Sequence, residues 1–153
     1  MALNKKIVVT NRKMFHEYDI FEKYEAGIVI TGSEVKSLRE SKASLQDSFC
    51  KIDNSEAFIY NFHITPYEKS TTWTSYNPKR KRKLLLHKRE IYRLFGRMTQ
   101  RGLTLVPSEM YFNKSGIVKL TICLAKKRKG PDKRELIKRK DLERELRSYK
   151  QFK

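Results

Sequence analysis

The sequence predicts a mainly β fold with short helices, arranged as a closed or nearly closed antiparallel barrel of about six strands. Three observations support this prediction. Short runs rich in β-branched and aromatic residues recur along the chain, turn-forming residues separate them, and only two segments of the body show the apolar spacing of a helix. Many short strands with intervening turns are typical of barrels, and the chain contains no internal repeat.

The N-terminal part predicts two strands and a helix. Residues 7–10 form a short β-branched run that ends in a basic turn, and residues 18–30 form a longer, aromatic-rich run. A glycine inside that run, Gly27, indicates a bulge or a close backbone approach. A Gly-Ser pair then ends the strand and begins a short helix over residues 34–39, from which Lys36 projects outward.

The middle of the chain predicts a hairpin and a second helix. Residues 45–52 and 57–64 read as paired strands around the turn-forming residues 53–56. Five consecutive cations follow at residues 79–83. Apolar residues at helical spacing then run from Leu84 to Met98, and a glycine ends the segment.

The last part of the body predicts further strands at residues 103–107, 109–112 and 117–124. The size of the predicted barrel and the net charge of the chain, +18 from 35 Lys/Arg against 17 Asp/Glu, fit a barrel of the oligonucleotide-binding type. A charge this large repels itself unless the chain normally binds a polyanion, and nucleic acid is the first candidate.

A boundary is expected after residue 125, between a barrel body (1–125) and a basic tail (126–153). The tail holds 13 Lys/Arg against 5 Asp/Glu, a net +8, and few apolar residues, so free in water it is expected to be disordered. It also carries helix signals, because Asp132 and Glu135 resemble a capping box. Two interpretations stay open: a tail that becomes helical on a polyanion, and a solvated tail that aids solubility.

Several classes of function find little support in the sequence. No phosphate-binding glycine loop, serine-nucleophile elbow or cofactor motif is present, and no apolar run is long enough to cross a membrane, so a cytoplasmic protein is expected. Cys50 and Cys123 lack metal-ligand spacing and read as buried free thiols. His87 beside the cation run could serve an RNA-processing enzyme as an acid, but no partner group is evident.

Seven blocks of residues are distinctive, namely Glu25-Ala26-Gly27-Ile28-Val29, Gly32-Ser33-Glu34-Val35-Lys36-Ser37-Leu38-Arg39, Asp47-Ser48-Phe49, His63-Ile64-Thr65-Pro66-Tyr67, Arg82-Lys83-Leu84-Leu85-Leu86, Gly102-Leu103-Thr104-Leu105-Val106-Pro107 and Asp132-Lys133-Arg134-Glu135. In sequence and in order, these blocks resemble the SsrA-binding protein (small protein B, SmpB) family of bacterial trans-translation.

This resemblance implies an RNA-binding factor that is not an enzyme and needs no cofactor. It implies that the body binds the tRNA-like domain of transfer-messenger RNA (SsrA RNA) in place of the missing anticodon arm. It further implies that the tail enters the decoding centre and the empty mRNA channel of a stalled ribosome, so that tagging of the nascent peptide can begin. The alternatives are a basic barrel that processes RNA and a ribosome-associated structural protein.

The family's functional positions map onto two sets of residues. The RNA-binding set expected for transfer-messenger RNA is Asn11, Tyr18, Glu25, Lys36, Arg82, Lys83, Leu85 and His87. The ribosome-binding set in the tail is Lys127, Arg128, Lys129, Asp132, Lys133 and Arg134. For Leu85, a core role and a base contact both remain open.

The tail departs from the family pattern at three places. Lys127 stands in the position of the usual glycine, Pro131 in that of a histidine or aromatic residue, and Leu142 in that of a later aromatic residue. The ribosome contact of this tail is therefore expected to depend more on charge and less on stacking.

Overall fold

A closed antiparallel β-barrel forms the body of the protein. The computed structural model describes residues 5–67, 76–128 and 140–146. Six strands pair in a ring in the order β8, β4, β5, β7, β2 and β9, and β9 returns to β8. The predicted barrel of about six strands is therefore confirmed.

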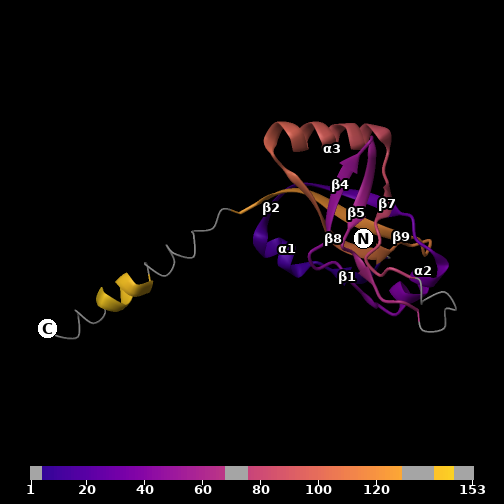
Figure 1. The fold of residues 1–153 in the computed structure, drawn as a ribbon, viewed down its shortest axis with the longest axis horizontal. Helices are drawn as coiled ribbons and strands as arrows, with labels where there is room; N and C mark the ends of the chain where they lie inside the picture. Colours follow the sequence, from indigo (N-terminus) through magenta and orange to yellow (C-terminus); the bar gives the residue numbers. More distant parts are fainter. Residues whose placement is uncertain (1–4, 68–75, 129–139, 147–153) are drawn as a thin grey trace.

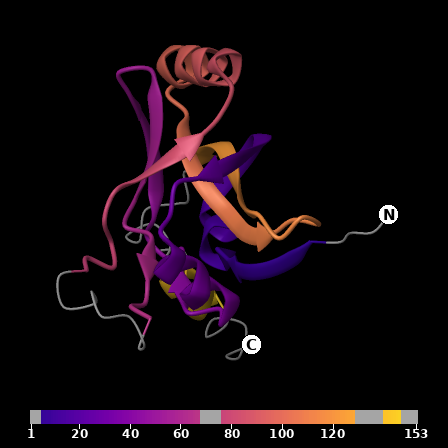
Figure 2. The same ribbon diagram turned by 90° about the vertical axis from the view of Figure 1, so that its right-hand side faces the viewer.

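The elements of the described body follow one another in this order: β1 (Lys6–Thr10), α1 (Arg12–Glu17), β2 (Tyr18–Ile28), α2 (Gly32–Arg39), β3 (Ala43–Ser44), β4 (Phe49–Asp53), β5 (Glu56–Tyr60), β6 (His63–Ile64), β7 (Arg82–Leu85), α3 (Lys88–Arg101), β8 (Thr104–Phe112) and β9 (Val118–Lys127). The strand β1 pairs with β8 outside the ring, and β3 pairs with β6. In Figures 1 and 2, α3 lies across one end of the barrel and α2 lies at the opposite end.

The alternation of side chains along the strands fills the barrel. Inward-facing aliphatic residues such as Ala57, Ile59, Leu84, Leu120 and Ile122 are almost completely buried, because successive residues of a strand point to opposite faces. Their charged or aromatic neighbours face outward. The outer surface is thus available for binding, while the core is apolar.

The β4–β5 hairpin turns where the sequence predicts. Asp53 pairs with Glu56, and the two residues between them, Asn54 and Ser55, both have positive φ (50° and 62°). Two such residues form the type I′ turn that matches the twist of a hairpin.

Several details differ from the sequence prediction. The strands expected at residues 45–52 and 57–64 are shorter, at Phe49–Asp53 and Glu56–Tyr60, and His63–Ile64 forms the separate strand β6. The basic turn after residue 10 begins a short helix, α1. Leu84, expected to start the second helix, lies in β7, and α3 begins at Lys88. The two strands expected at residues 103–107 and 109–112 are one strand, β8, with an irregular register between Pro107 and Glu109. Proline lacks the N–H for ladder pairing, and strands accommodate it at such bulges.

The strand β9 continues past the boundary expected after residue 125. β9 extends to Lys127, and the N–H of Arg128 donates to the carbonyl of Glu17 at 2.8 Å. Residues 140–146 are helical and exposed, with Leu142 and Leu146 57% and 56% accessible. The expected helix start at Asp132 lies outside the described residues.

Candidate functional site

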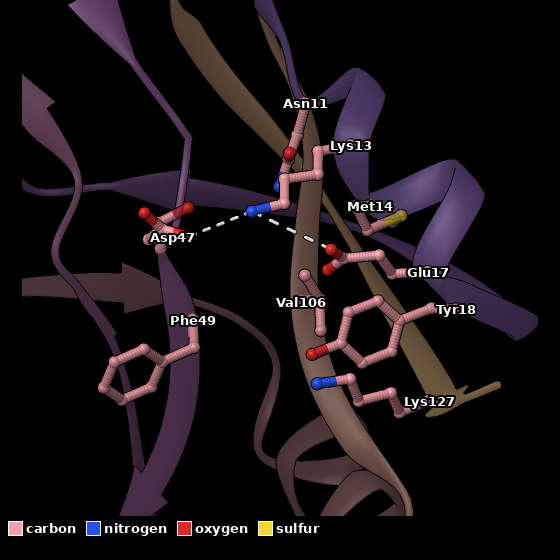
Figure 3. A pocket seen from close by; sticks show the side chains of 10 residues that line it. Asn11, Lys13, Met14, Glu17, Tyr18, Asp47, Phe49, Val106 and Lys127 are labelled. Atoms are coloured by element: carbon pink, nitrogen blue, oxygen red, sulfur yellow. Dashed lines mark ion pairs between the residues drawn. The ribbon is translucent and has the colours of Figure 1, made fainter. Parts of the chain in front are cut away.

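A hollow of about 320 Å³ opens beside α1, where β2 begins and β9 ends. Two residues of the expected RNA-binding set, Asn11 and Tyr18, line it together with Lys13, Phe49 and Lys127 (Figure 3). Residues from the N-terminal helix, the β4 strand and the end of β9 thus meet at one place.

The bulge in β8 holds Asn11 at the wall of this hollow. The backbone N–H of Asn11 donates to the carbonyl of Ser108 at 2.7 Å, and its side-chain Nδ2 donates to the carbonyl of Pro107 at 3.1 Å. Only 7% of Asn11 is exposed. A fixed amide at the rim of a hollow has the donor and acceptor atoms that can bind a base edge or a ribose hydroxyl.

An aromatic ring and cations face the same hollow. Tyr18 and Lys127 are cross-strand partners, and their side chains extend side by side toward Phe49 (Figure 3). Tyr18 packs against a small cluster that contains Met14 and Val106 and stays partly exposed in the hollow. A partly exposed aromatic ring can stack on a planar ligand such as a base.

Two carboxylates partly neutralise the positive charge of the hollow. The Nζ atom of Lys13 lies 3.8 Å from Glu17 Oε1 and 3.9 Å from Asp47 Oδ1. Exposed ion pairs of this kind contribute little to stability, so Lys13 can exchange these partners for a phosphate.

A second group of expected RNA-binding residues lies toward the other end of β2. Tyr18 and Gly27 are nine residues apart on this strand, which is at most about 30 Å along the strand at ~3.3 Å per residue. Glu25 is exposed near Gly27, and its Oε2 accepts a hydrogen bond from the Tyr111 hydroxyl. Burial, and then the neighbouring Glu25 carboxylate, raise the pKa of Tyr111 to about 12, which keeps this hydroxyl a donor at neutral pH.

Leu85 lies on the outer surface rather than in the core. It pairs with Gly27 across β2 and β7 and is 53% exposed. A Cβ atom added to Gly27 would stand 3.2 Å from Leu85 Cβ, so the glycine allows the leucine to lie close against the β2 backbone. His87 follows two residues later as the N-cap of α3, and its N–H donates to Glu90 Oε1 at 3.2 Å. Glu25, Leu85 and His87 thus lie near one another.

Two expected phosphate contacts are exposed. Lys36 lies on α2, with Nζ 5.4 Å from the centre of the Tyr67 ring. Lys83 lies on β7, with Nζ 3.5 Å from Glu56 Oε2. Both ammonium groups make only weak surface contacts and are available to an anion.

The expectation that Arg82 contacts phosphate is wrong for this structure, because its side chain is completely buried. Its guanidinium donates to Glu34 through Nε at 2.7 Å and through Nη2, and to the Phe62 carbonyl through Nη1 at 2.6 Å. It also donates to Tyr76 and to the carbonyl of Pro78. Arg82 therefore holds the segment before β7 in place.

Glu34 is the acceptor at the centre of this buried network. Its carboxylate also accepts from the Thr31 N–H at 2.9 Å, which completes the capping box of α2, and from Arg80. Burial alone would raise the pKa of Glu34, but the hydrogen bonds from Arg80, Thr31 and Arg82 outweigh it and lower the pKa to about 2. This residue of the Gly32–Arg39 block thus joins α2 to β7.

Three residues of these surfaces were not among the expected site residues, namely Lys13, Phe49 and Tyr111. Phe49 could have been found, because it alternates with the apolar Cys50 along its strand and so lies on the same outward face as Lys51. Tyr111 had no such signal, because its contact with Glu25 joins residues 86 positions apart. Of the expected tail set, Lys127 and Arg128 lie at the end of the body, and Arg128 Nε donates to Asp19 at 2.9 Å. The other four lie outside the described residues.

The described residues were also compared with the requirements of a metal site, a membrane-spanning helix and a reactive thiol. No group of three or more potential metal ligands occurs among them, and none of their helices is long and apolar enough to span a membrane. Cys50 and Cys123 are buried and free, as expected. Burial raises the pKa of both thiols, which makes them poor nucleophiles.

Comparison with known proteins relates almost the whole chain to one family. The family model described as "SmpB protein" matches residues 8–151. The SsrA-binding protein of Persephonella marina is 54% identical over 141 residues, which cover 92% of this chain and 91% of that protein. The SsrA-binding protein of Coprothermobacter proteolyticus is 51% identical over 142 residues, covering 93% and 95% of the two chains.

A solved structure shares the fold. It is described as "tmRNA-SmpB: a journey to the center of the bacterial ribosome", and its matching chain has a TM-score of 0.66 and 46% identity. The match covers 80% of this chain and 85% of that chain.

Proposed function

The chain belongs to the SmpB protein family, and we propose that it is an RNA-binding factor of trans-translation. In this proposal the body binds the tRNA-like domain of transfer-messenger RNA in place of an anticodon arm. The tail then enters the decoding centre and the mRNA channel of a stalled ribosome in the cytoplasm. The protein catalyses no reaction itself.

The observation that carries this proposal is the extent of the match. Relatives with the name SsrA-binding protein share about half of all residues over more than 90% of both chains. The match therefore includes the barrel surface as well as most of the tail. The net charge of +18 supports the same proposal, because a polyanionic partner neutralises it.

The surface geometry supports two contact regions for the RNA. The first is the hollow with Asn11 and Tyr18, where stacking and base-edge hydrogen bonds can combine. The second is the group of Glu25, Leu85 and His87 near Gly27. The two regions lie at different ends of β2, up to ~30 Å apart along the strand, so we propose that they bind separate parts of the same folded RNA domain.

A competition gel shift at physiological salt tests the proposed function. The labelled ligand is transfer-messenger RNA, and unlabelled transfer-messenger RNA or an ordinary tRNA competes for the protein. Transfer-messenger RNA is expected to compete much more strongly, because recognition of a particular RNA shape survives the salt that weakens general phosphate binding. Equal competition by both RNAs would show that the protein binds RNA only through charge. Cleavage of the RNA would instead favour a processing enzyme.

Replacing Gly27 with Ala tests the position of Leu85. The new methyl group stands 3.2 Å from Leu85 Cβ, so the half-exposed leucine must move away from β2. We expect the unfolding free energy to change by less than ~1 kcal/mol, because an alanine in a strand also lowers the entropy of the unfolded chain. The affinity for transfer-messenger RNA is expected to fall several-fold in the gel shift.

Gly32→Ala is the matched control, because no heavy atom lies within 4 Å of its added Cβ. Its affinity is expected to equal that of the parent protein. If Gly27→Ala also binds normally, the close fit of Leu85 against β2 is unimportant for RNA binding.

A further inference from the structure

The outer face of the β4–β5 hairpin and of the neighbouring β7 segment carries aromatic rings and lysines. Of these residues, only Lys83 belongs to the expected RNA-binding set. Phe49 and Tyr60 are cross-strand partners whose ring centres lie 5.3 Å apart at an angle of 11°. Phe58 lies two residues from Tyr60 on the same face of β5, and all three side chains are partly exposed. We call this surface the aromatic face, and it consists of Phe49, Phe58, Tyr60, Lys51, Lys81 and Lys83.

Lysine side chains cover these rings. Lys51 Nζ lies 5.4 Å from the centre of the Phe49 ring and 5.8 Å from that of Tyr60. Lys81 Nζ lies 4.3 Å from the centre of the Phe58 ring. Such contacts between exposed ammonium groups and rings are weak, so a flat ligand can displace the lysines at little cost.

The negative charges on this surface do not block the rings. The outward carboxylates of the hairpin, Asp53 and Glu56, lie at its turn, where they flank Asn54 and Ser55. Glu56 is paired with Lys83. At the other end, Asp47 precedes Phe49 and lies 3.9 Å from Lys13 Nζ, so a lysine faces a carboxylate at each end of this surface.

We propose that the aromatic face binds unpaired nucleotides of a single-stranded RNA segment. The bases stack on the Phe58 ring and on the Phe49–Tyr60 pair, and Lys51, Lys81 and Lys83 contact the phosphates. Aromatic rings along a strand face with cations between them are the combination that single-stranded nucleic acid needs, because every base has a flat apolar surface. This inference builds on the proposed RNA-binding function and adds a second surface to it.

The position of the aromatic face argues for continuity with the hollow beside α1. Phe49 belongs to both, since it lines the hollow and stacks on Tyr60. At the other side, Phe58 pairs with Lys83 of β7, two residues before Leu85. A single-stranded RNA segment that leaves a folded RNA bound at the hollow can thus continue across β4 and β5.

Binding of a labelled oligouridine of about ten nucleotides to the full chain tests this proposal, with fluorescence anisotropy at physiological salt as the readout. The Phe58→Leu variant and the Phe49→Leu/Tyr60→Leu variant are each expected to bind about 10-fold more weakly, because leucine keeps the apolar packing but loses the ring. Phe58→Tyr keeps the ring and is expected to bind normally. Phe95→Leu is the matched control, because this ring is 53% exposed on α3.

A second arm measures binding of the tRNA-like domain of transfer-messenger RNA by Phe58→Leu, because Phe49 also lines the hollow proposed to bind this RNA. The proposal predicts that this affinity is unchanged while the oligouridine affinity of Phe58→Leu falls. Equal oligouridine binding by all variants, or a parallel loss of both ligands by Phe58→Leu, would overturn it. Failure of the proposed function has a different signature, because the unmodified protein would then show no preference for transfer-messenger RNA over tRNA.

Discussion

Replacing Glu34 with Gln is expected to lower the free energy of unfolding by about 3–5 kcal/mol, because it leaves the Arg82 charge buried without a carboxylate. Arg82 is completely buried and Glu34 is 1% exposed, so water cannot take over the lost interaction. For a chain of this size, such a loss lowers the melting temperature by roughly 10 °C. Thermal and urea unfolding followed by circular dichroism measure both quantities.

The same pair predicts how the stability of the protein depends on pH. The folded-state pKa of Glu34, about 2, lies below its ordinary value of 4.5. The unfolded chain therefore takes up the proton first as the pH falls. The contribution of Glu34 is fully present above pH ~5 and is lost as the pH falls toward 2, with a total of about 3 kcal/mol at 1.36 kcal/mol per pKa unit. In the Glu34→Gln variant this part of the acid dependence is expected to be absent.

Glu40→Gln is the control for both measurements. Glu40 follows α2 directly and pairs with Lys42 at 3.2 Å, but its side chain is 49% exposed. An exposed pair contributes at most about 1 kcal/mol, so this variant is expected to unfold almost like the parent protein. Similar stability losses in the two variants would show that burial of the Glu34–Arg82 pair has no special effect.

The barrel was predictable because its signal is local. Alternation of apolar and polar residues along each strand, and turn-forming residues such as Asn54 and Ser55, depend on neighbours in the sequence. The predicted ends of helices and strands were wrong where contacts between residues far apart in the sequence decided the structure. Leu84 has the spacing of a helix residue, but β7 pairs with β2 and β5 and draws it into the sheet.

Arg82 shows why the site was harder to predict than the fold. It belongs to a run of five consecutive cations, and such residues are usually exposed. Nothing in the neighbouring sequence indicates that one of them turns inward. The partner that makes burial tolerable, Glu34, is 48 residues away. Since a buried arginine needs such a partner, only the tertiary structure separates Arg82 from its exposed neighbours, Lys81 and Lys83.

The hollow beside α1 was half predictable for a similar reason. Asn11 and Tyr18 were expected from the family resemblance, and they do lie together. Their environment depends on the bulge at Pro107 and Ser108, which brings two carbonyl groups to Asn11. A proline within a strand run is a visible signal of a bulge, but it does not reveal which residue of the neighbouring strand end the bulge will bind.

Replacing Tyr18 with Leu is expected to weaken binding of transfer-messenger RNA by about 5- to 150-fold. The proposed stacking of a base on an aromatic ring contributes about 1–3 kcal/mol, and leucine retains the packing against Met14 and Val106 without offering a planar surface. The gel shift with the tRNA-like domain measures the affinity, and thermal unfolding shows whether the barrel stays intact.

Two further variants separate stacking from other causes. Tyr18→Phe keeps the ring and loses only the hydroxyl, so stacking predicts nearly normal affinity for it, whereas a hydrogen bond from the hydroxyl predicts a loss as large as that of Tyr18→Leu. Tyr92→Leu makes the same change at a ring that is 79% exposed on α3, outside both proposed contact regions, and should leave the affinity unchanged. If Tyr18→Leu binds the RNA as tightly as the parent protein, the hollow beside α1 is not a stacking site, and the proposed recognition must come from hydrogen bonds by Asn11 and from the region of Glu25, Leu85 and His87.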